Sequence, residues 1–260
     1  MAAKFPRVIL GTMLTERTTL VQFLIEERRR HPGASGELNR LVLDVALACK
    51  AIASRVAVGA LGGVLGSAEE VNVQGETQQK LDVMANDYFL RATEWSGYVA
   101  GMVSEEVAEP YRIPDRFPRG KYLLVFGPLD GSSSIGVNVS VGSIFPILRA
   151  PNPGAEQVRE DFLQQGTEQV CAGYAIYGPS TMIVLSVGTG VHAFTLDPSL
   201  GEFFLTRESI KTPTTTREFA INASNQRFLD PAVQQYVSEC LAGRSGPRGK
   251  DFNMRWVASL

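Results

Sequence analysis

Three groups of acidic side chains in this sequence are of the kind that handles metal ions and phosphate. Glu76 and Asp82 lie in the stretch QGETQQKLD, the adjacent Glu105 and Glu106 follow the apolar run GYVAGMV, and Asp130 lies in GPLDGSSS. Carboxylates that converge on a hard cation such as Mg²⁺ supply oxygen ligands, and the cation neutralises phosphate charge and activates water. These residue types therefore favour metal-assisted hydrolysis of a phosphate.

The segment GPLDGSSS carries the most specific of these signals. Asp130 follows the apolar run YLLVF, and Gly131, Ser132 and Ser133 come directly after it. A glycine followed by serines allows consecutive backbone amides and hydroxyls to point at one phosphate. We interpret the segment as a sharp turn that follows a strand and cradles a phosphate.

Each group also has a purely structural interpretation. PLDG is a common turn sequence, and adjacent glutamates after a strand are often solvated at its edge. Glu76 and Asp82 would also suit the N-terminus of a helix, where the dipole favours acids. The occurrence of all three groups in one chain favours a site. His31 and His192 lie far apart, so a zinc hydrolase or a Ser/His/Asp triad has little support.

Helical periodicity predicts the elements that position the first of these acids. Thr19 and Gln22 fit a capping box at the start of a first helix. A second helix is expected over residues 38–56, where apolar residues recur every three or four positions. A third is expected around residues 78–92, just past a polar turn that contains Glu76.

Short apolar runs predict strands after these helices. They read YVAGMV, YLLVF, VNVSVGSIFPIL, STMIVLSV, VHAFTL and EFFLT, and Val137, Val139 and Val141 alternate with period two. From Pro213 the sequence predicts a short strand, FAINAS, and a helix, DPAVQQYVSECLAG. We therefore predict an α+β fold in which a helical pair and a mixed sheet fill residues 1–212, and an incomplete second α/β domain begins at residues 213–260.

Composition excludes several other classes of protein. The chain has 260 residues, of which 44% are hydrophobic and 20% charged, as in a soluble globular protein. A net charge of -2 gives no field to attract nucleic acid. The three cysteines are widely separated, and no apolar run is long enough for a signal peptide or a membrane span. We expect a cytoplasmic protein that binds neither nucleic acid nor membrane.

The motifs together resemble class 1 fructose-1,6-bisphosphatases, in order and spacing, over nearly the whole chain. The segments that carry the resemblance are GELNRLVLDVALACKAIASRV, NVQGETQQKLDVMAND, VSEE, RGKYLLVFGPLDGSSS, SVGSIF, YGPSTMIVLSVGTGVHAFTLD, INASN and FNMRWVAS. The resemblance implies a layered helix and sheet fold in two halves, assembled as a homotetramer. It also implies hydrolysis of fructose 1,6-bisphosphate to fructose 6-phosphate, with Mg²⁺ or Mn²⁺, in gluconeogenesis or the Calvin cycle.

The resemblance also implies roles for individual residues. Metal ligands would be Glu105, Asp130, the Leu129 carbonyl and Glu76, with Glu106 in the same acidic cluster and acting in catalysis. Glu76 and Asp82 would activate the attacking water, Asp82 as the base. Substrate would be held by Asp130, Gly131, Ser132, Ser133 and Asn222, and by Arg255, which would reach the 6-phosphate in a neighbouring subunit.

Many members of this family are inhibited by AMP, and the matching positions are present here. They are Ser35, Gly36, Glu37 and Leu38, with Lys121, Tyr122 and Arg149 able to face the AMP phosphate. Lys121 and Arg149 would also be ordinary as surface charges, so this assignment keeps a structural alternative.

The sequence departs from the family pattern at several places. Gly127 and Gly136 stand where the family has aspartate, and Ser134 where it has asparagine. The chain ends at Leu260, before the family's later tyrosine, lysine and last metal-binding glutamate. We therefore expect hydrolysis far below that of a normal member. Two alternatives are a catalytically dead fragment or pseudoenzyme that retains effector binding or oligomerisation, and a phosphatase similar to inositol monophosphatase.

Overall fold

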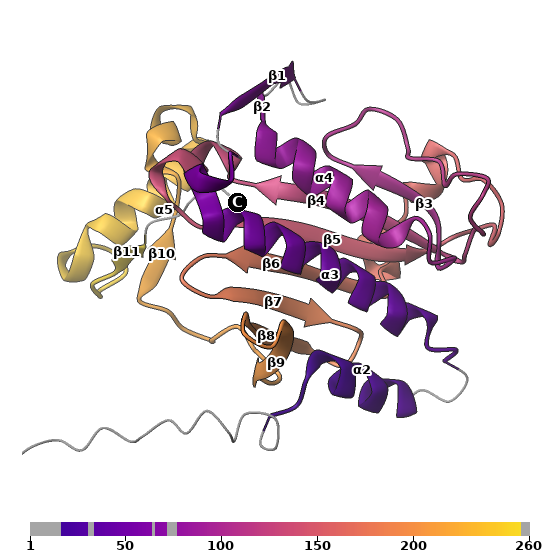
Figure 1. Ribbon diagram of the computed structural model, residues 1–260. Coiled ribbons are helices and arrows are strands. Elements are labelled where there is room, and N and C mark those ends of the chain that lie inside the picture. Colours follow the sequence, from indigo (N-terminus) through magenta and orange to yellow (C-terminus); the bar gives the residue numbers. More distant parts are fainter. Residues whose placement is uncertain (1–16, 31–33, 64–65, 72–76, 256–260) are drawn as a thin grey trace, which may run out of the picture.

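The computed structural model of the chain describes residues 17–30, 34–63, 66–71 and 77–255 (Figure 1). The polar turn expected before the third helix, with Glu76, lies outside the described residues.

Three helices open the fold near the expected positions. They are α2 (Leu20–Arg29), α3 (Glu37–Val58) and α4 (Lys80–Thr93). The predicted capping box is confirmed, because the Gln22 N–H donates to Thr19 Oγ1 at 3.1 Å and the Thr19 N–H donates to Gln22 Oε1 at 2.9 Å. The apolar stripe of α3, including Val45 and Ile52, is buried against the rest of the protein.

A seven-stranded mixed sheet forms the centre of the molecule, in the order β3-β4-β5-β6-β7-β8-β9. Its strands are β3 (Val99–Ser104), β4 (Tyr122–Asp130), β5 (Val141–Arg149), β6 (Cys171–Tyr177), β7 (Thr181–Ser186), β8 (Val191–Asp197) and β9 (Glu202–Arg207). Only β3 and β4 pair in parallel, and the other neighbours are antiparallel. The mixed sheet was predicted, but β6 was missed.

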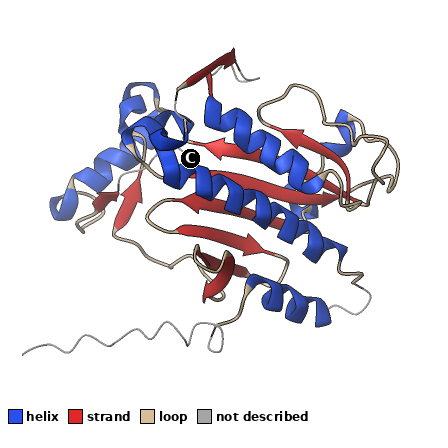
Figure 2. Cartoon of the chain, viewed as in Figure 1, coloured by secondary structure: helices blue, strands red, loops and turns tan. Residues whose placement is uncertain are grey.

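Helices α3 and α4 lie across one face of this sheet, and α2 lies beside β9 (Figures 1 and 2). The main hydrophobic core fills the space between these layers. A second, smaller cluster on Ala100, Leu123, Leu148 and Ala150 packs with Phe162 of the short helix η3 (Arg159–Phe162). This layered arrangement of helices on a mixed sheet confirms the predicted α+β class.

Two expectations about the strands were wrong. Val137 belongs to the 3₁₀ helix η2 (Ser132–Val137), and β5 begins only at Val141, because Asn138 takes a left-handed φ of 61° that interrupts an extended chain. Strand β4 does not stop before GPLD but continues to Asp130, and the left-handed turn falls at Gly131, whose φ is 78°.

The remaining elements form two small sheets and one helix. Strands β1 (Ser67–Val71) and β2 (Thr77–Gln79) pair antiparallel, and β10 (Glu218–Ala220) pairs in parallel with β11 (Asn253–Arg255). Helix α5 (Pro231–Leu241) covers a small apolar cluster with β10. The predicted strand FAINAS is shorter than expected, since residues 223–228 form the 3₁₀ helix η5. No helix in the described ranges combines the length and apolar character that a membrane span requires.

Helix α3 contains a partly buried acid, Asp44, whose charged form is disfavoured by burial. Burial raises the pKa of its carboxyl to about 6 from 3.8, against weaker opposing effects of a Ser96 hydrogen bond and the Arg40 charge. Because the folded protein then holds a proton that the unfolded chain has lost, the free energy of unfolding falls as pH rises from about 4 to about 6.

We therefore expect Asp44→Asn to stabilise the protein at pH 7 by about 1 kcal/mol, after allowance for the partial exposure of Asp44, and to change little at pH 4. Urea unfolding at the two pH values measures the effect. Asp87→Asn, on the exposed side of α4, is the control. An equal response of wild type and Asp44→Asn to pH would contradict this account.

Candidate functional site

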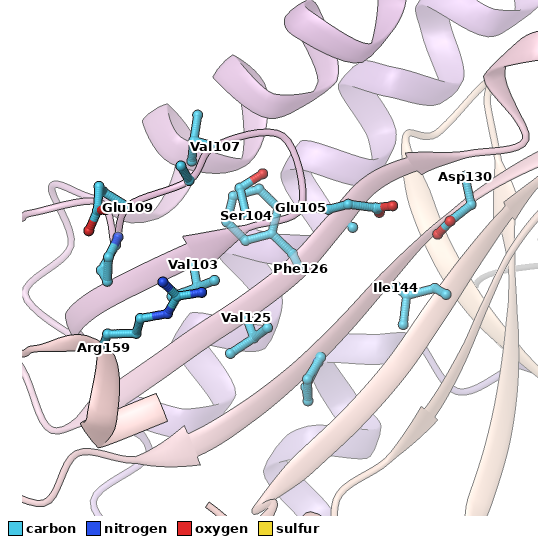
Figure 3. A pocket seen from close by; sticks show the side chains of 14 residues that line it. Val103, Ser104, Glu105, Val107, Glu109, Val125, Phe126, Asp130, Ile144 and Arg159 are labelled. Atoms are coloured by element: carbon cyan, nitrogen blue, oxygen red, sulfur yellow. The ribbon is translucent and has the colours of Figure 1, made fainter. Parts of the chain in front are cut away.

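The carboxylates of Glu105 and Asp130 converge at one edge of the sheet. They follow and end the parallel neighbours β3 and β4, and the carboxyl ends of parallel strands meet at the same edge. A β-carbon placed on Gly127 would lie 2.8 Å from Glu105 Oε2 and 3.2 Å from Asp130 Oδ2. The two carboxylates therefore face each other across a residue that has no side chain (Figure 3).

These carboxylates open onto a hollow of about 610 Å³. Apart from Glu105 and Asp130 its walls are mainly apolar, and a single arginine reaches it from η3 (Figure 3). The other labelled lining residues are Val103, Ser104, Val107, Glu109, Val125, Phe126, Ile144 and Arg159. Low-polarity walls strengthen the attraction between the two carboxylates and a cation that enters.

A β-bulge in β4 turns Asp130 toward this hollow. Gly127 pairs with Ile144 on β5, whereas Asp130 pairs with Gly142, so one extra residue lies in β4 between the two pairs. The sequence carried a signal for this feature in Pro128, because a proline inside a strand pattern is confined to edges and bulges. We had interpreted the segment only as a turn.

The bulge reverses the alternation of side chains along β4. Leu124 and Phe126 belong to the core beneath the helices, and beyond the bulge Leu129 belongs to that core as well. In a regular strand, residues three apart point to opposite faces. With the extra residue, Asp130 faces the same side as Gly127 and can meet Glu105.

The other predicted acids take different places. Glu106 accepts a hydrogen bond from Gln78 Nε2 at 2.5 Å, which ties the end of β3 to β2. Asp82 is 3% exposed and accepts the Gln79 N–H at 2.6 Å at the start of α4. Asp82 is absent from the lining of the hollow formed by the described residues, and Glu76 lies outside those residues.

The two convergent carboxylates suit a Mg²⁺ or Mn²⁺ ion. Mg²⁺ is commonly held by one or two carboxylates, with waters and substrate phosphates as its remaining ligands. In the described part of the chain, no three Asp, Glu, His or Cys side chains gather closely enough to hold an ion by themselves. Glu105 and Asp130 therefore fit a cation that also takes ligands from water and substrate.

The residues expected to hold substrate fall in two regions. Asp130, Gly131, Ser132 and Ser133 are continuous from the end of β4 into η2, and Asp130 lines the hollow. The other two, Asn222 and Arg255, are exposed and belong to the region of the small β10–β11 sheet.

Arg255 is already engaged within the chain. Its guanidinium forms an ion pair with Glu218 on the neighbouring strand. This contact lowers the pKa of the Glu218 carboxyl and raises the pKa of Arg255. Arg255 would have to exchange this exposed partner for a phosphate in order to bind one.

A second hollow, of about 560 Å³, gathers most of the residues expected to bind AMP. Those that line it are Ser35, Gly36, Leu38, Lys121, Tyr122 and Arg149. The remaining predicted residue, Glu37, lines an adjoining hollow. Sequence reasoning missed Arg28, Asn39 and Gln169, which line the same space. Asn39 follows Leu38 directly in the GELNRL segment, whereas Arg28 and Gln169 belong to no quoted motif.

Cations surround this second hollow. Lys121 Nζ lies 2.5 Å from Glu37 Oε2 and 3.1 Å from Ser35 Oγ, and the Lys121 contact lowers the pKa of the Glu37 carboxyl. Lys121 Nζ and Arg149 Cζ lie 5.8 Å and 5.9 Å from the centre of the Tyr122 ring. Two positive groups flanking an aromatic ring form a suitable place for an anion attached to a planar base.

Comparison with known proteins places the chain in a family. The model "Fructose-1-6-bisphosphatase, N-terminal domain" matches residues 18–208. A class 1 fructose-1,6-bisphosphatase of Methylibium petroleiphilum is 66% identical over 244 residues, which cover 94% of this chain and 68% of that protein. Another from Hydrogenophilus thermoluteolus is 63% identical over 243 residues, 93% of this chain and 68% of that protein.

Solved structures agree. Leishmania major fructose-1,6-bisphosphatase in holo form is 33% identical with a TM-score of 0.84, covering 94% of this chain and 74% of that one. The apo form of the same enzyme is 31% identical with a TM-score of 0.78, covering 94% of this chain and 72% of that one. With agreement in sequence and in fold, the chain belongs to the class 1 fructose-1,6-bisphosphatase family.

Proposed function

We propose that this chain hydrolyses the 1-phosphate of fructose 1,6-bisphosphate, giving fructose 6-phosphate and phosphate, with the help of Mg²⁺ or Mn²⁺. The observation that carries the proposal is the convergence of Glu105 and Asp130 across Gly127, beside the turn that begins at Gly131. Family membership with relatives named fructose-1,6-bisphosphatase supports the same reaction.

The residues at the sheet edge divide the work of binding and proton transfer. Glu105, Asp130 and the Leu129 carbonyl would hold the cation, with Glu76 as a further ligand. When bound, the cation offsets phosphate charge and makes water a better nucleophile. Asp82 is the proposed base, assisted by Glu76. The hydrogen bond that Asp82 accepts from the Gln79 N–H fixes the orientation of the Asp82 carboxylate.

The turn after β4 and the region of the small β10–β11 sheet would orient the substrate. The amides and hydroxyls of Gly131, Ser132 and Ser133 would hold the transferred phosphate together with Asp130. Glu106, which accepts a hydrogen bond from Gln78, is proposed to assist catalysis from the position next to Glu105. Asn222 and Arg255 would contact the sugar phosphate, and an arginine suits this because its planar fork pairs two phosphate oxygens.

Gly127 weakens this site. The two carboxylates that remain face a position where the family carries a third, and glycine offers no side-chain ligand. We propose that the chain binds cations weakly and hydrolyses its substrate slowly. The relatives' names do not favour a catalytically dead protein or a phosphatase similar to inositol monophosphatase.

Domain division, assembly and setting belong to the same proposal. The match to an N-terminal-domain model ends at residue 208, which supports a boundary near residues 212 and 213. A homotetramer in the cytoplasm, acting in gluconeogenesis or the Calvin cycle, follows the family pattern. Arg255 would then reach the substrate of a neighbouring subunit.

AMP is the proposed effector at the second hollow. The Lys121 and Arg149 charges beside Tyr122 support the binding of a nucleotide phosphate there. Leishmania major fructose-1,6-bisphosphatase, which this chain resembles in fold, has a solved structure described as a T-state.

Phosphate release from fructose 1,6-bisphosphate tests the proposed activity. We expect slow release with Mg²⁺ or Mn²⁺, none with EDTA, and a loss of about 10²-fold or more in Glu105→Gln, because a metal ligand is removed. Glu160→Gln, an exposed acid in η3, is the matched control and should behave as wild type. Release that survives both EDTA and Glu105→Gln would rule the mechanism out.

Restoring the missing acid tests the role of Gly127. Gly127→Asp places a third carboxylate against Glu105 and Asp130, so without a cation it should lower the unfolding midpoint through like-charge repulsion. With Mg²⁺ at about 100 times its Kd, binding should stabilise the variant by about 2.7 kcal/mol. Thermal unfolding in EDTA and in Mg²⁺ measures both effects.

The control for that experiment is Gly166→Asp, because a β-carbon at Gly166 meets no atom within 4 Å. It adds the same charge away from the site and should show no additional response to Mg²⁺. If Gly127→Asp responds to Mg²⁺ no more than Gly166→Asp does, Gly127 does not occupy a cation site.

AMP should raise the thermal unfolding temperature of the wild-type chain. At about 100 times its Kd a ligand stabilises a protein by about 2.7 kcal/mol. Arg149→Gln should remove most of this shift, since it deletes a cation that lines the hollow, whereas Lys211→Gln, an exposed residue elsewhere, should retain it. The absence of any shift at saturating AMP would count against the site.

A further inference from the structure

A chain of buried hydroxyl groups ends at the bulge in β4. Ser143 Oγ donates to the Pro128 carbonyl oxygen at 2.6 Å and lies 2.7 Å from the Tyr177 hydroxyl. Ser143 is 0% exposed and Tyr177 is 1% exposed, so neither hydroxyl can exchange its partner for water. Such a group is costly to bury unless its hydrogen bonds are made.

The direction of this chain follows from counting protons. A carbonyl oxygen only accepts, so the single Ser143 proton must go to Pro128, and Tyr177 must then donate to Ser143 Oγ. The hydroxyl chain therefore runs from Tyr177 on β6 through Ser143 on β5 to Pro128 on β4.

Ser143 on β5 lies directly opposite the bulge in β4. With Gly127 opposite Ile144 and Asp130 opposite Gly142, Ser143 alone faces the two residues between them. Pro128 is buried and has no N–H, so it cannot donate to a ladder hydrogen bond there. The Pro128 carbonyl oxygen accepts a hydrogen bond from the Ser143 hydroxyl, so a side-chain donor takes the place of a backbone N–H.

The bulge is what directs Asp130. Without the extra residue, Asp130 would point to the face opposite Gly127, away from Glu105. An interaction that stabilises the bulged register therefore also fixes which way the Asp130 carboxylate points.

We propose that Ser143, oriented by Tyr177, is a positioning residue that holds the β4 bulge in the register that aims Asp130 at Glu105 and the cation. This deepens the proposed function and rests on it for the cation. Ser143 touches neither cation nor substrate in this role and acts only through the Pro128–Asp130 backbone.

The test compares Ser143→Ala, Tyr177→Phe and Ser143→Thr with wild type by two measurements. Titration with Mn²⁺ gives cation affinity, and hydrogen–deuterium exchange of the peptide that spans residues 127–133 reports the bulge. We expect Ser143→Ala to weaken Mn²⁺ binding about tenfold, as loss of support for a metal ligand commonly does, and to speed exchange in this peptide. Tyr177→Phe should have a smaller effect on both measurements. Ser143→Thr, which keeps the hydroxyl, should show the Mn²⁺ affinity and the exchange rate of wild type.

Thr93→Val is the matched control for lost stability. It also removes a hydroxyl from a fully buried residue, since Thr93 Oγ1 donates to the Phe89 carbonyl at 2.8 Å on α4. It should lower the unfolding temperature and leave both Mn²⁺ affinity and exchange at residues 127–133 unchanged.

The outcomes separate this inference from the proposed function. If Ser143→Ala loses stability but keeps native exchange and native Mn²⁺ affinity, the positioning role is wrong. If wild type itself binds no Mn²⁺, the cation in the proposed function fails, and the exchange data alone then decide whether Ser143 holds the bulge. Equal changes in Thr93→Val would also overturn the proposal, because they would reduce it to general destabilisation.

Discussion

Two carboxylates held face to face are the constraint around which this sheet edge is organised. Glu105 and Asp130 approach across Gly127, and like charges at such a distance repel unless a cation or a proton compensates. Glu105 follows the edge strand β3 and Asp130 ends its neighbour β4, and hydrogen bonds between these two parallel strands hold the two residues at one end of the sheet. Two carboxylates that approach each other in this way offer a divalent cation two oxygen ligands.

The rigidity needed for this comes from the layers beneath. Helices α3 and α4 cover the face of the sheet opposite the hollow, and their shared core contains the residues on either side of the β4 bulge. Hydrogen bonds connect Tyr177, which lies in that core, through Ser143 to the Pro128 carbonyl. The packing of this core and the hydrogen bond from Ser143 thus both hold the backbone of β4 at its bulge.

Gly127 leaves this apparatus in place while removing one of its charges. The two remaining acids close around this position, since a β-carbon there would lie 2.8 Å from Glu105 Oε2 and 3.2 Å from Asp130 Oδ2. The second hollow is organised differently. One of its cations, Lys121, already pairs with Glu37, and a bound anion would have to compete with that pair.

The sequence by itself determined the helices, most of the strands and the family. These rest on local periodicity, on capping at Thr19 and on motif spacing, all of which are written in short segments. Only the tertiary structure decided that β4 runs through Pro128 to Asp130 and that a bulge there reverses the alternation of its side chains. It also decided that Ser143 lies opposite the bulge and donates a hydrogen bond to Pro128. Register depends on pairing between distant strands, so no single segment could specify it.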